Sequence, residues 1–322
     1  MNRRFFGIAG ITICVESELE FDSSSFGKEF ESFTVDGPGD DNVKIRHIFD
    51  LPDPGDIHPG VEVYRKPPWA ISRDAERGMW IYRGISPTPG DLRLHRVAVF
   101  SDDHTQAVIY SPKREAEFIR ETGWPSLSLL PTDQIWLAPL LADRNAVLLH
   151  SAAVILNGKG LLFVGHSGAG KSTITNMLKN FLNPDLKGLQ DLSGPDCHEC
   201  EILCDDRNIA RRMDDGWRVY GSWSHGDVPE VSGNDAPLRA VCFIEKSDEN
   251  RLAPLVDRKE IMRRLLACLI RPLVTANWWN QTLDLVERMS GEVPCYVMRF
   301  DRSGEIVNNL ITQCANQLID QR

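Results

Sequence analysis

Residues 165–172 read Gly-His-Ser-Gly-Ala-Gly-Lys-Ser and fit the pattern G-x-x-x-x-G-K-[ST]. The glycines allow successive backbone N–H groups to turn inward and face phosphate oxygens, which a Cβ atom would obstruct. Residues 161–164 are all apolar, as expected of a buried strand, and residues 173–181 have the pattern of a helix. A strand, a glycine-rich loop and a helix in this order predict a phosphate-binding loop in an α/β fold.

This loop predicts which side chains bind a nucleotide. Lys171 is expected to reach the β- and γ-phosphates of a nucleoside triphosphate, and the Ser172 hydroxyl to ligate magnesium. The loop therefore predicts a nucleoside triphosphate and Mg²⁺ as ligands, and leaves the base of the nucleotide open. The helix that begins near Lys171 directs its N-terminus at the same oxygens. The predicted nucleotide-binding residues are Gly165, His166, Ser167, Gly168, Ala169, Gly170, Lys171, Ser172 and Thr173.

An acidic pair follows the next strand-like segment. Asp205 and Asp206 come directly after residues 200–204, a short distance along the chain from the loop. A carboxylate at the end of a neighbouring strand can hold the metal or accept the proton of an attacking hydroxyl, and two carboxylates can divide these tasks. The alternative is a solvated acidic turn that only ends a strand.

Two histidine-containing segments are further candidates. His150 lies in the apolar stretch 148–153, where a histidine is more often a core residue than a catalyst. Residues 221–226 read Gly-Ser-Trp-Ser-His-Gly, which suits a loop that faces a substrate and equally suits an exposed turn. The residues alone leave both alternatives open.

The two halves of the chain differ in predicted secondary structure, and we expect a domain boundary near residue 130. The first half is β-rich, and its turns contain Gly, Pro and Asp. Strands are predicted there at 6–15, 43–49, 61–64, 79–85, 96–100 and 107–110. In the second half, helices are predicted at 133–141, 173–181, 258–273, 282–289 and 305–318, and strands at 146–149, 154–156, 161–164, 200–204, 241–244 and 295–300.

Composition restricts the class of protein. The formal net charge of −10 over 322 residues argues against a nucleic-acid partner. No apolar run reaches the roughly 18 residues that a membrane-spanning helix needs. Residues 1–15 mimic a short signal peptide but lead into acidic residues 16–20, so we interpret them as a strand. The eight cysteines show no disulfide framework. We expect a cytoplasmic protein.

From Leu148 to Asp206 the sequence resembles the catalytic domain of the HPr kinase/phosphorylase family. It is more similar still to the HPr-kinase-like proteins of peptide-modification gene cassettes, including lasso-peptide kinases. The resemblance covers roughly 140–322, and the β-rich first half matches in general texture. The matching features are Leu149-His150-Ser151-Ala152-Ala153-Val154, the loop 165–173, the pair Asp205-Asp206, the loop 221–226, and the segments 238–255 and 293–297.

This resemblance implies a P-loop kinase domain of the HPr kinase/phosphoenolpyruvate carboxykinase type over 131–322, behind a β-rich docking or scaffold domain over 1–130. It implies an ATP- and Mg²⁺-dependent kinase that phosphorylates a serine, or a threonine, of a peptide or small protein. Asp205 would be the catalytic base, Lys171 and His150 would lie in the same catalytic site, and Ser172 and Asp206 would bind the metal. Because HPr kinases assemble into hexamers, the resemblance also implies a homo-oligomer. The glycine-rich signature of true HPr kinases is not found, so phosphorylation of HPr itself and the reverse phosphorolysis are both in doubt.

Three other functions compete with this reading. Residues 190–195 weakly resemble the signature motif of transporter ATPases, but they lie too close to the phosphate loop in sequence to be presented to the nucleotide of a partner subunit. A zinc site would use Cys197 and Cys200 with His198 between them, but a second such pair is absent from the sequence. A nucleotide-dependent peptide-binding module without phosphotransfer would not need Lys171, Ser172 and Asp205 intact.

Overall fold

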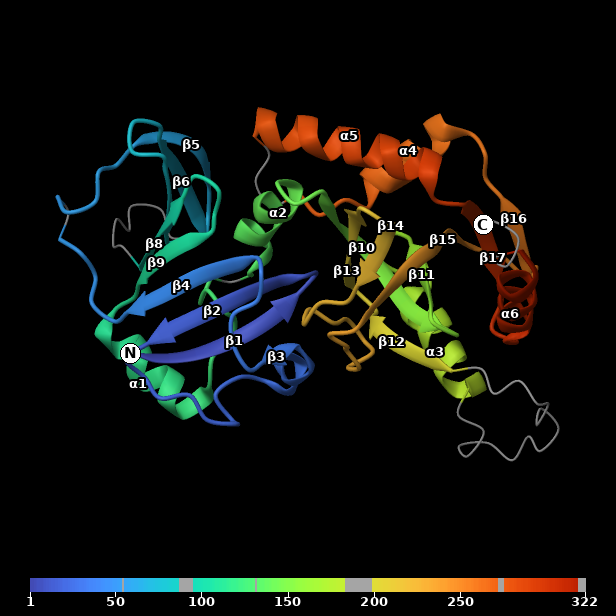
Figure 1. Ribbon diagram of the computed structural model, residues 1–322, viewed down its shortest axis with the longest axis horizontal. Coiled ribbons are helices and arrows are strands. Elements are labelled where there is room, and N and C mark those ends of the chain that lie inside the picture. The colour runs from blue at the N-terminus through green and yellow to red at the C-terminus, as the bar shows by residue number, and fades with distance from the viewer. Residues whose placement is uncertain (54, 87–94, 131, 183–198, 272–274, 318–322) are drawn as a thin grey trace. The chain divides into compact units, whose positions relative to one another are not determined.

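A computed structural model describes the chain except for residues 54, 87–94, 131, 183–198, 272–274 and 318–322 (Figure 1). Its contacts divide into two compact units, Met1–Leu140 and Leu141–Arg322. The division falls inside helix α2 (Gln134–Ala142), later than the boundary expected near residue 130. The reason is local: Asp133 accepts hydrogen bonds from the backbone N–H groups of Leu127 and Ser128, at 3.0 Å each, which ties this stretch to the first unit.

The first unit is built on a nine-stranded sheet, with strand order β3-β1-β2-β4-β9-β8-β7-β6-β5 among the described residues. A 3₁₀ helix, η1 (Lys28–Phe33), and helix α1 (Lys113–Thr122) accompany it. The strands are β1 (Asn2–Ile8), β2 (Ile11–Ser17), β3 (Thr34–Val35), β4 (Asn42–Ile48), β5 (Val61–Lys66), β6 (Trp69–Asp74), β7 (Met79–Gly84), β8 (Arg96–Ser101) and β9 (Gln106–Tyr110).

One prediction for this unit is wrong. The single strand expected over 6–15 is the hairpin of β1 and β2, because Ala9 and Gly10 both adopt positive φ, at 50° and 75°. Two positive φ angles in a two-residue loop match the twist of antiparallel strands, which makes such a turn favourable in a hairpin. β3, β6, η1 and α1 were not predicted, whereas the other expected strands are present.

The second unit contains an eight-stranded sheet with helices on both of its faces (Figure 1). Its strands are β10 (Ala146–Leu156), β11 (Lys159–Val164), β12 (Cys200–Cys204), β13 (Arg207–Met213), β14 (Gly216–Tyr220), β15 (Asp235–Lys246), β16 (Arg251–Pro254) and β17 (Cys295–Phe300). The helices that follow α2 along the chain are α3 (Lys171–Leu182), α4 (Arg258–Ala267), α5 (Ala276–Glu292) and α6 (Glu305–Gln317).

Strand β10 changes partners along its length. Its first half pairs with β13 as far as His150, and its second half pairs with β11 from Ser151 onward. The two short strands expected at 146–149 and 154–156 are therefore one continuous strand. His150 lies at the point where β10 passes from one set of partners to the other, which sets it apart from a residue inside a uniform sheet.

Two apolar clusters pack the helices against the sheet. On one face, α4 and α5 place Leu265 and Val286 with Leu149 and Phe243 of the strands. On the other face, α3 and α6 cover residues such as Phe163. Neighbouring strand residues point to opposite faces, so both faces of β10, β11 and β15 are buried and these strands are apolar nearly throughout.

Helix α4 is shorter than the helix expected over 258–273. It begins at the N-cap Asp257, whose carboxylate accepts from the backbone N–H groups of Lys259 and Glu260. It ends at Ala267, because the next residues turn back to the sheet: the carbonyl of Cys268 accepts from His150 N, at 2.7 Å, and Leu269 bridges to Leu149. Among the described residues, no helix combines the length and the apolar character needed to cross a bilayer.

Candidate active site

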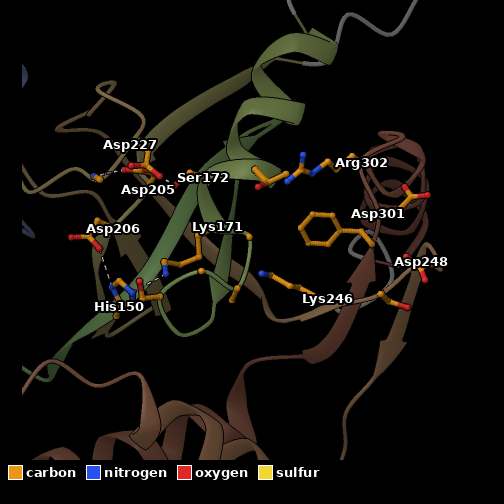
Figure 2. A pocket seen from close by; sticks show the side chains of 18 residues that line it. His150, Lys171, Ser172, Asp205, Asp206, Asp227, Lys246, Asp248, Asp301 and Arg302 are labelled. Atoms are coloured by element: carbon orange, nitrogen blue, oxygen red, sulfur yellow. Dashed lines mark hydrogen bonds and ion pairs between the residues drawn. The ribbon is translucent and has the colours of Figure 1, made fainter.

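Four strands of the second unit end at one edge of the sheet. β11, β15 and β17 are parallel to one another, and β12 runs in the same direction because β11 and β12 both pair antiparallel with β10. Ligands of α/β sheets bind outside the carboxyl ends of parallel strands. A cavity of about 870 Å³ opens at this edge (Figure 2). It is lined by residues 167–173, 205–206, 226–227, 246–248 and 300–302, together with His150.

The phosphate loop connects β11 to α3, as predicted. Gly168 and Gly170 have φ angles of 75° and 119°, in the region that L side chains rarely adopt. A Cβ atom at Gly170 would also lie 3.1 Å from the ring of Phe300, at the end of β17. The curled loop therefore requires glycine at both positions, and its backbone faces the cavity.

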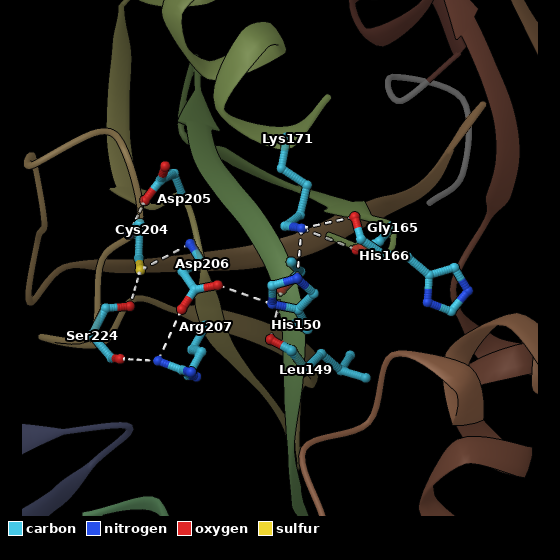
Figure 3. Close-up of polar contacts among 12 residues, drawn as sticks. Leu149, His150, Gly165, His166, Lys171, Cys204, Asp205, Asp206, Arg207 and Ser224 are labelled. Carbon is cyan, nitrogen blue, oxygen red and sulfur yellow. Dashed lines mark hydrogen bonds and ion pairs between the residues drawn. The ribbon is translucent and has the colours of Figure 1, made fainter. Parts of the chain in front are cut away.

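Lys171 is buried although it is a cation. Its Nζ donates to the carbonyl oxygens of Gly165, at 3.0 Å, and His166, at 3.2 Å, and lies 2.8 Å from His150 Nε2 (Figure 3). Burial lowers the pKa of the Lys171 ammonium, against the attraction of nearby carboxylates, chiefly Asp206. A desolvated ammonium that donates only to neutral groups is suited to bind phosphate oxygens.

His150 joins Lys171 to Asp206. Its Nδ1 is 2.9 Å from Asp206 Oδ1. An ammonium group can only donate, so His150 Nε2 accepts from Lys171, and the ring proton is assigned to Nδ1, where it is donated to Asp206. Burial raises the pKa of Asp206, but the hydrogen bond from His150 and the charges of Arg207 and Lys171 outweigh it and hold this pKa below its usual value.

Asp205 is held on the other side of the loop. Its carboxylate accepts from the Ser172 hydroxyl, at 2.9 Å, and from the backbone N–H groups of Gly226 and Val228. Asp205 is buried, with 1% of the residue exposed. The two carboxylates of the predicted pair therefore have different partners: Asp205 is joined to the predicted magnesium ligand, and Asp206 to the histidine.

A buried amide supports the turn that carries both carboxylates. Asn208 Nδ2 donates to the carbonyl oxygens of Ser151, at 2.6 Å, and Cys204, at 3.1 Å. We expect Asn208→Ala to lower the free energy of unfolding by about 3 kcal/mol, because two buried carbonyls lose their donor. Denaturant unfolding measures this change. Asn234→Ala, which removes an exposed bond to Glu201, is the matched control and should cost less than about 1 kcal/mol; equal losses in the two variants would contradict the role of Asn208.

Most of the predicted site residues do line the cavity, and two do not. Gly165 and His166 contribute carbonyl oxygens to Lys171 but lie outside the lining. From the loop 221–226, only Gly226 reaches it. The prediction missed Asp227, Lys246, Asp248, Asp301 and Arg302. A signal was available for four of them, because Lys246, Asp248, Asp301 and Arg302 lie within a few residues of the ends of the strands expected at 241–244 and 295–300, where carboxyl ends of strands gather. Asp227 follows no expected strand.

A fragment of this architecture is similar to a known enzyme structure. The similar structure is the HPr(Ser) kinase/phosphatase from Coxiella burnetii, of which 98% is covered against 53% of the present chain. The sequence identity is 9% and the TM-score is 0.29. No family model matches the sequence, and no curated protein matches it either. With such low identity and TM-score, this similarity supports no conclusion about function. A function has to be inferred from the site itself.

The donor set of the site suits a magnesium ion. In the described part of the chain, no group of three or more His, Cys, Asp or Glu side chains could hold a metal alone. Magnesium is usually held by one or two carboxylates, water and substrate phosphates, so the Ser172 hydroxyl and the Asp205 carboxylate fit it. Cys197 and His198 of the considered zinc site lie outside the described residues.

Proposed function

We propose that this protein is a kinase that transfers the γ-phosphoryl group of ATP to a serine, or threonine, hydroxyl of a peptide or small protein. One observation supports the proposal above the others. A single cavity brings together the phosphate loop, the Ser172–Asp205 pair and the chain of Lys171, His150 and Asp206. These are the parts that phosphoryl transfer to a hydroxyl requires: a phosphate cradle, a metal position and a proton acceptor.

The hydrogen bond between Ser172 and Asp205 supports a metal role for Asp205. Ser172 is the loop hydroxyl expected to ligate magnesium, and Asp205 Oδ2 lies 2.9 Å from it. We therefore assign the metal to Ser172 and Asp205, where the sequence had assigned it to Ser172 and Asp206. Bound Mg²⁺ would neutralise charge on the β- and γ-phosphates during transfer.

His150 and Asp206 then form the proton acceptor, a role that the sequence had given to Asp205. When Lys171 turns from His150 to the phosphates of a bound nucleotide, the lone pair on His150 Nε2 becomes available to an acceptor hydroxyl. Asp206, on Nδ1, orients the ring and stabilises the imidazolium that forms, as a carboxylate does for a histidine base in other enzymes. Catalysis otherwise consists of positioning and charge neutralisation by Lys171 and the loop amides.

The test is incubation with γ-labelled ATP, Mg²⁺ and a lysate of the source cells. We expect a labelled peptide or protein with the wild type, and none with Asp205→Asn, which should keep nucleotide binding because the phosphate loop is intact. Asp215→Asn, at an exposed site of the same unit, is the control and should label normally. Label released only as phosphate would indicate an ATPase, and label retained in ATP would indicate a binding module without transfer.

A separate measurement tests the proton acceptor. We expect His150→Gln to bind the nucleotide with near wild-type affinity and to transfer phosphate about 10²- to 10⁴-fold more slowly, the usual contribution of general base catalysis. Single-turnover rates at saturating ATP separate this effect from binding. An unchanged rate in His150→Gln would overturn the assignment of His150 as the proton acceptor.

A further inference from the structure

Two cations of the cavity take no part in the mechanism above. Lys246 ends β15 and Arg302 follows β17, and both side chains line the cavity. Both residues are exposed, and neither side chain makes an ion pair or a hydrogen bond with the described residues. Since carboxylates outnumber cations in this chain, with 46 Asp and Glu against 36 Lys and Arg, two cations without a partner in one cavity indicate an anionic ligand.

Their position specifies which part of a ligand they meet. Figure 2 shows Asp205, Asp206 and His150 on one side of Lys171 and Ser172, and Lys246 and Arg302 on the other side. The side with Asp205, Asp206 and His150 is where the γ-phosphoryl group would react, whereas Asp248 and Asp301 lie on the same side as Lys246 and Arg302. A nucleotide held by the phosphate loop with its γ-phosphate on that side must extend its α-phosphate and nucleoside toward Lys246 and Arg302.

The segments that carry these cations are fixed to each other. Asn250, in the turn after β15, donates from Nδ2 to Asp301 Oδ1, at 2.9 Å, and to Ser303 Oγ, at 3.2 Å. Asp301 also accepts from Ser303 N, at 2.8 Å, which closes the turn after β17. The preceding residue, Phe300, packs against Gly170 of the phosphate loop. Lys246, at the end of β15, and Arg302, in the turn after β17, thus have a defined position relative to the phosphate loop.

We infer that Lys246 and Arg302 bind the α-phosphate of the nucleotide and so position it for transfer. This inference rests on the proposed function, because it takes the ligand of the phosphate loop to be a nucleotide. Lysine supplies a point charge and arginine a planar fork of donors, and both bind phosphate oxygens. Their contribution is to the affinity for the nucleotide, since they lie away from the transferred group.

Titration calorimetry with ADP and with a non-hydrolysable ATP analogue, both with Mg²⁺, tests the inference. An α-phosphate contact is common to the two ligands. We therefore expect Lys246→Ala and Arg302→Ala each to weaken both ligands by about tenfold and by the same factor. Lys246→Arg should restore most of the affinity. Lys259→Ala, which removes an exposed cation of α4 outside the cavity, is the matched control and should leave both affinities unchanged.

The outcomes separate this inference from the proposed function. Wild-type affinity of the Ala variants for both ligands would overturn the inference and leave the kinase proposal standing. Weaker binding of the ATP analogue alone would also overturn it, because the contact would then be with the γ-phosphate. A wild-type protein that binds neither ligand would refute nucleotide binding itself. Both positions are exposed, so the variants should fold, and thermal unfolding verifies this.

Discussion

Lys171→Met is expected to slow phosphoryl transfer by about 10³-fold or more, in a protein that remains folded. Lys171 is the cation that the structure holds beside both the phosphate loop and His150, with its Nζ 2.8 Å from His150 Nε2. Methionine keeps most of the aliphatic volume and removes the charge that would stabilise the transferring phosphoryl group. Lys171→Ala should lose the activity equally, but it leaves a larger cavity.

The folded state should survive because burial already disfavours the charge that is removed. The pKa of Lys171 is lowered chiefly by desolvation, so a neutral side chain avoids that cost. The loss is limited to the carbonyls of Gly165 and His166 and to His150, which lose a donor. Thermal unfolding should show a modest shift, and single-turnover kinetics a large one.

A matched control lies on the same helix. Lys179 of α3 pairs with Glu230 and does not line the cavity, so Lys179→Met makes the same chemical change outside the site. We expect its transfer rate to remain within about twofold of the wild type, because a partly exposed ion pair contributes little. A folded Lys171→Met protein that turns over as fast as Lys179→Met would refute the mechanism.

The first unit is expected to lose stability steeply as the pH falls below 6.5. His47 and His104 are buried, and burial lowers their pKa values to about 3 and about 4 from the ordinary 6.5. His47 Nε2 lies 2.9 Å from the carbonyl oxygen of Leu127, and His104 Nε2 lies 2.8 Å from the Tyr82 hydroxyl. The Nδ1 atoms of both rings are buried and have no hydrogen-bond partner in the described structure, so a proton added there would have no acceptor.

The direction of the effect follows from proton binding. The unfolded chain takes up protons at these histidines below pH 6.5, whereas the folded unit does not until pH about 4 and about 3. The contribution of the two neutral histidines to the stability of the unit is therefore fully present well above pH 6.5, and it is lost as the pH falls toward their folded-state pKa values. The cost of each histidine approaches about 1.4 kcal/mol per pH unit below pH 6.5, so the pair should cost about 3 kcal/mol between pH 6.5 and pH 5.

Hydrogen exchange at the amides of β4 and β8, corrected for intrinsic rates, measures this loss within the first unit. His47→Gln keeps a donor near the carbonyl of Leu127 and removes the titration. The number of protons taken up on unfolding, given by the change of the unfolding free energy with pH, should therefore fall by about one. His225→Gln, at an exposed ring of the second unit, should leave the slope unchanged. A pH-independent stability of the wild type between pH 7 and pH 5 would contradict the prediction.

The sequence alone determined the parts of the site that depend on local chain order. Residues 161–182 specify a strand, a turn that only glycine can make and a helix, and each of these depends on neighbours a few residues away. For the same reason most strands of the first half were predicted. The hairpin at Ala9 and Gly10 was missed because positive φ at an alanine has no sequence signal comparable to Asn-Gly.

Only the tertiary structure decided how the site is assembled. Asp205 and Asp206 are adjacent in sequence, yet one contacts Ser172 and the other His150, because successive residues after a strand diverge and each meets a different element. Lys246 and Arg302 reach the same cavity because β15 and β17 are parallel to β11 and end at the same edge. Pairings over such separations depend on sheet order, which the pattern of a single chain does not encode locally.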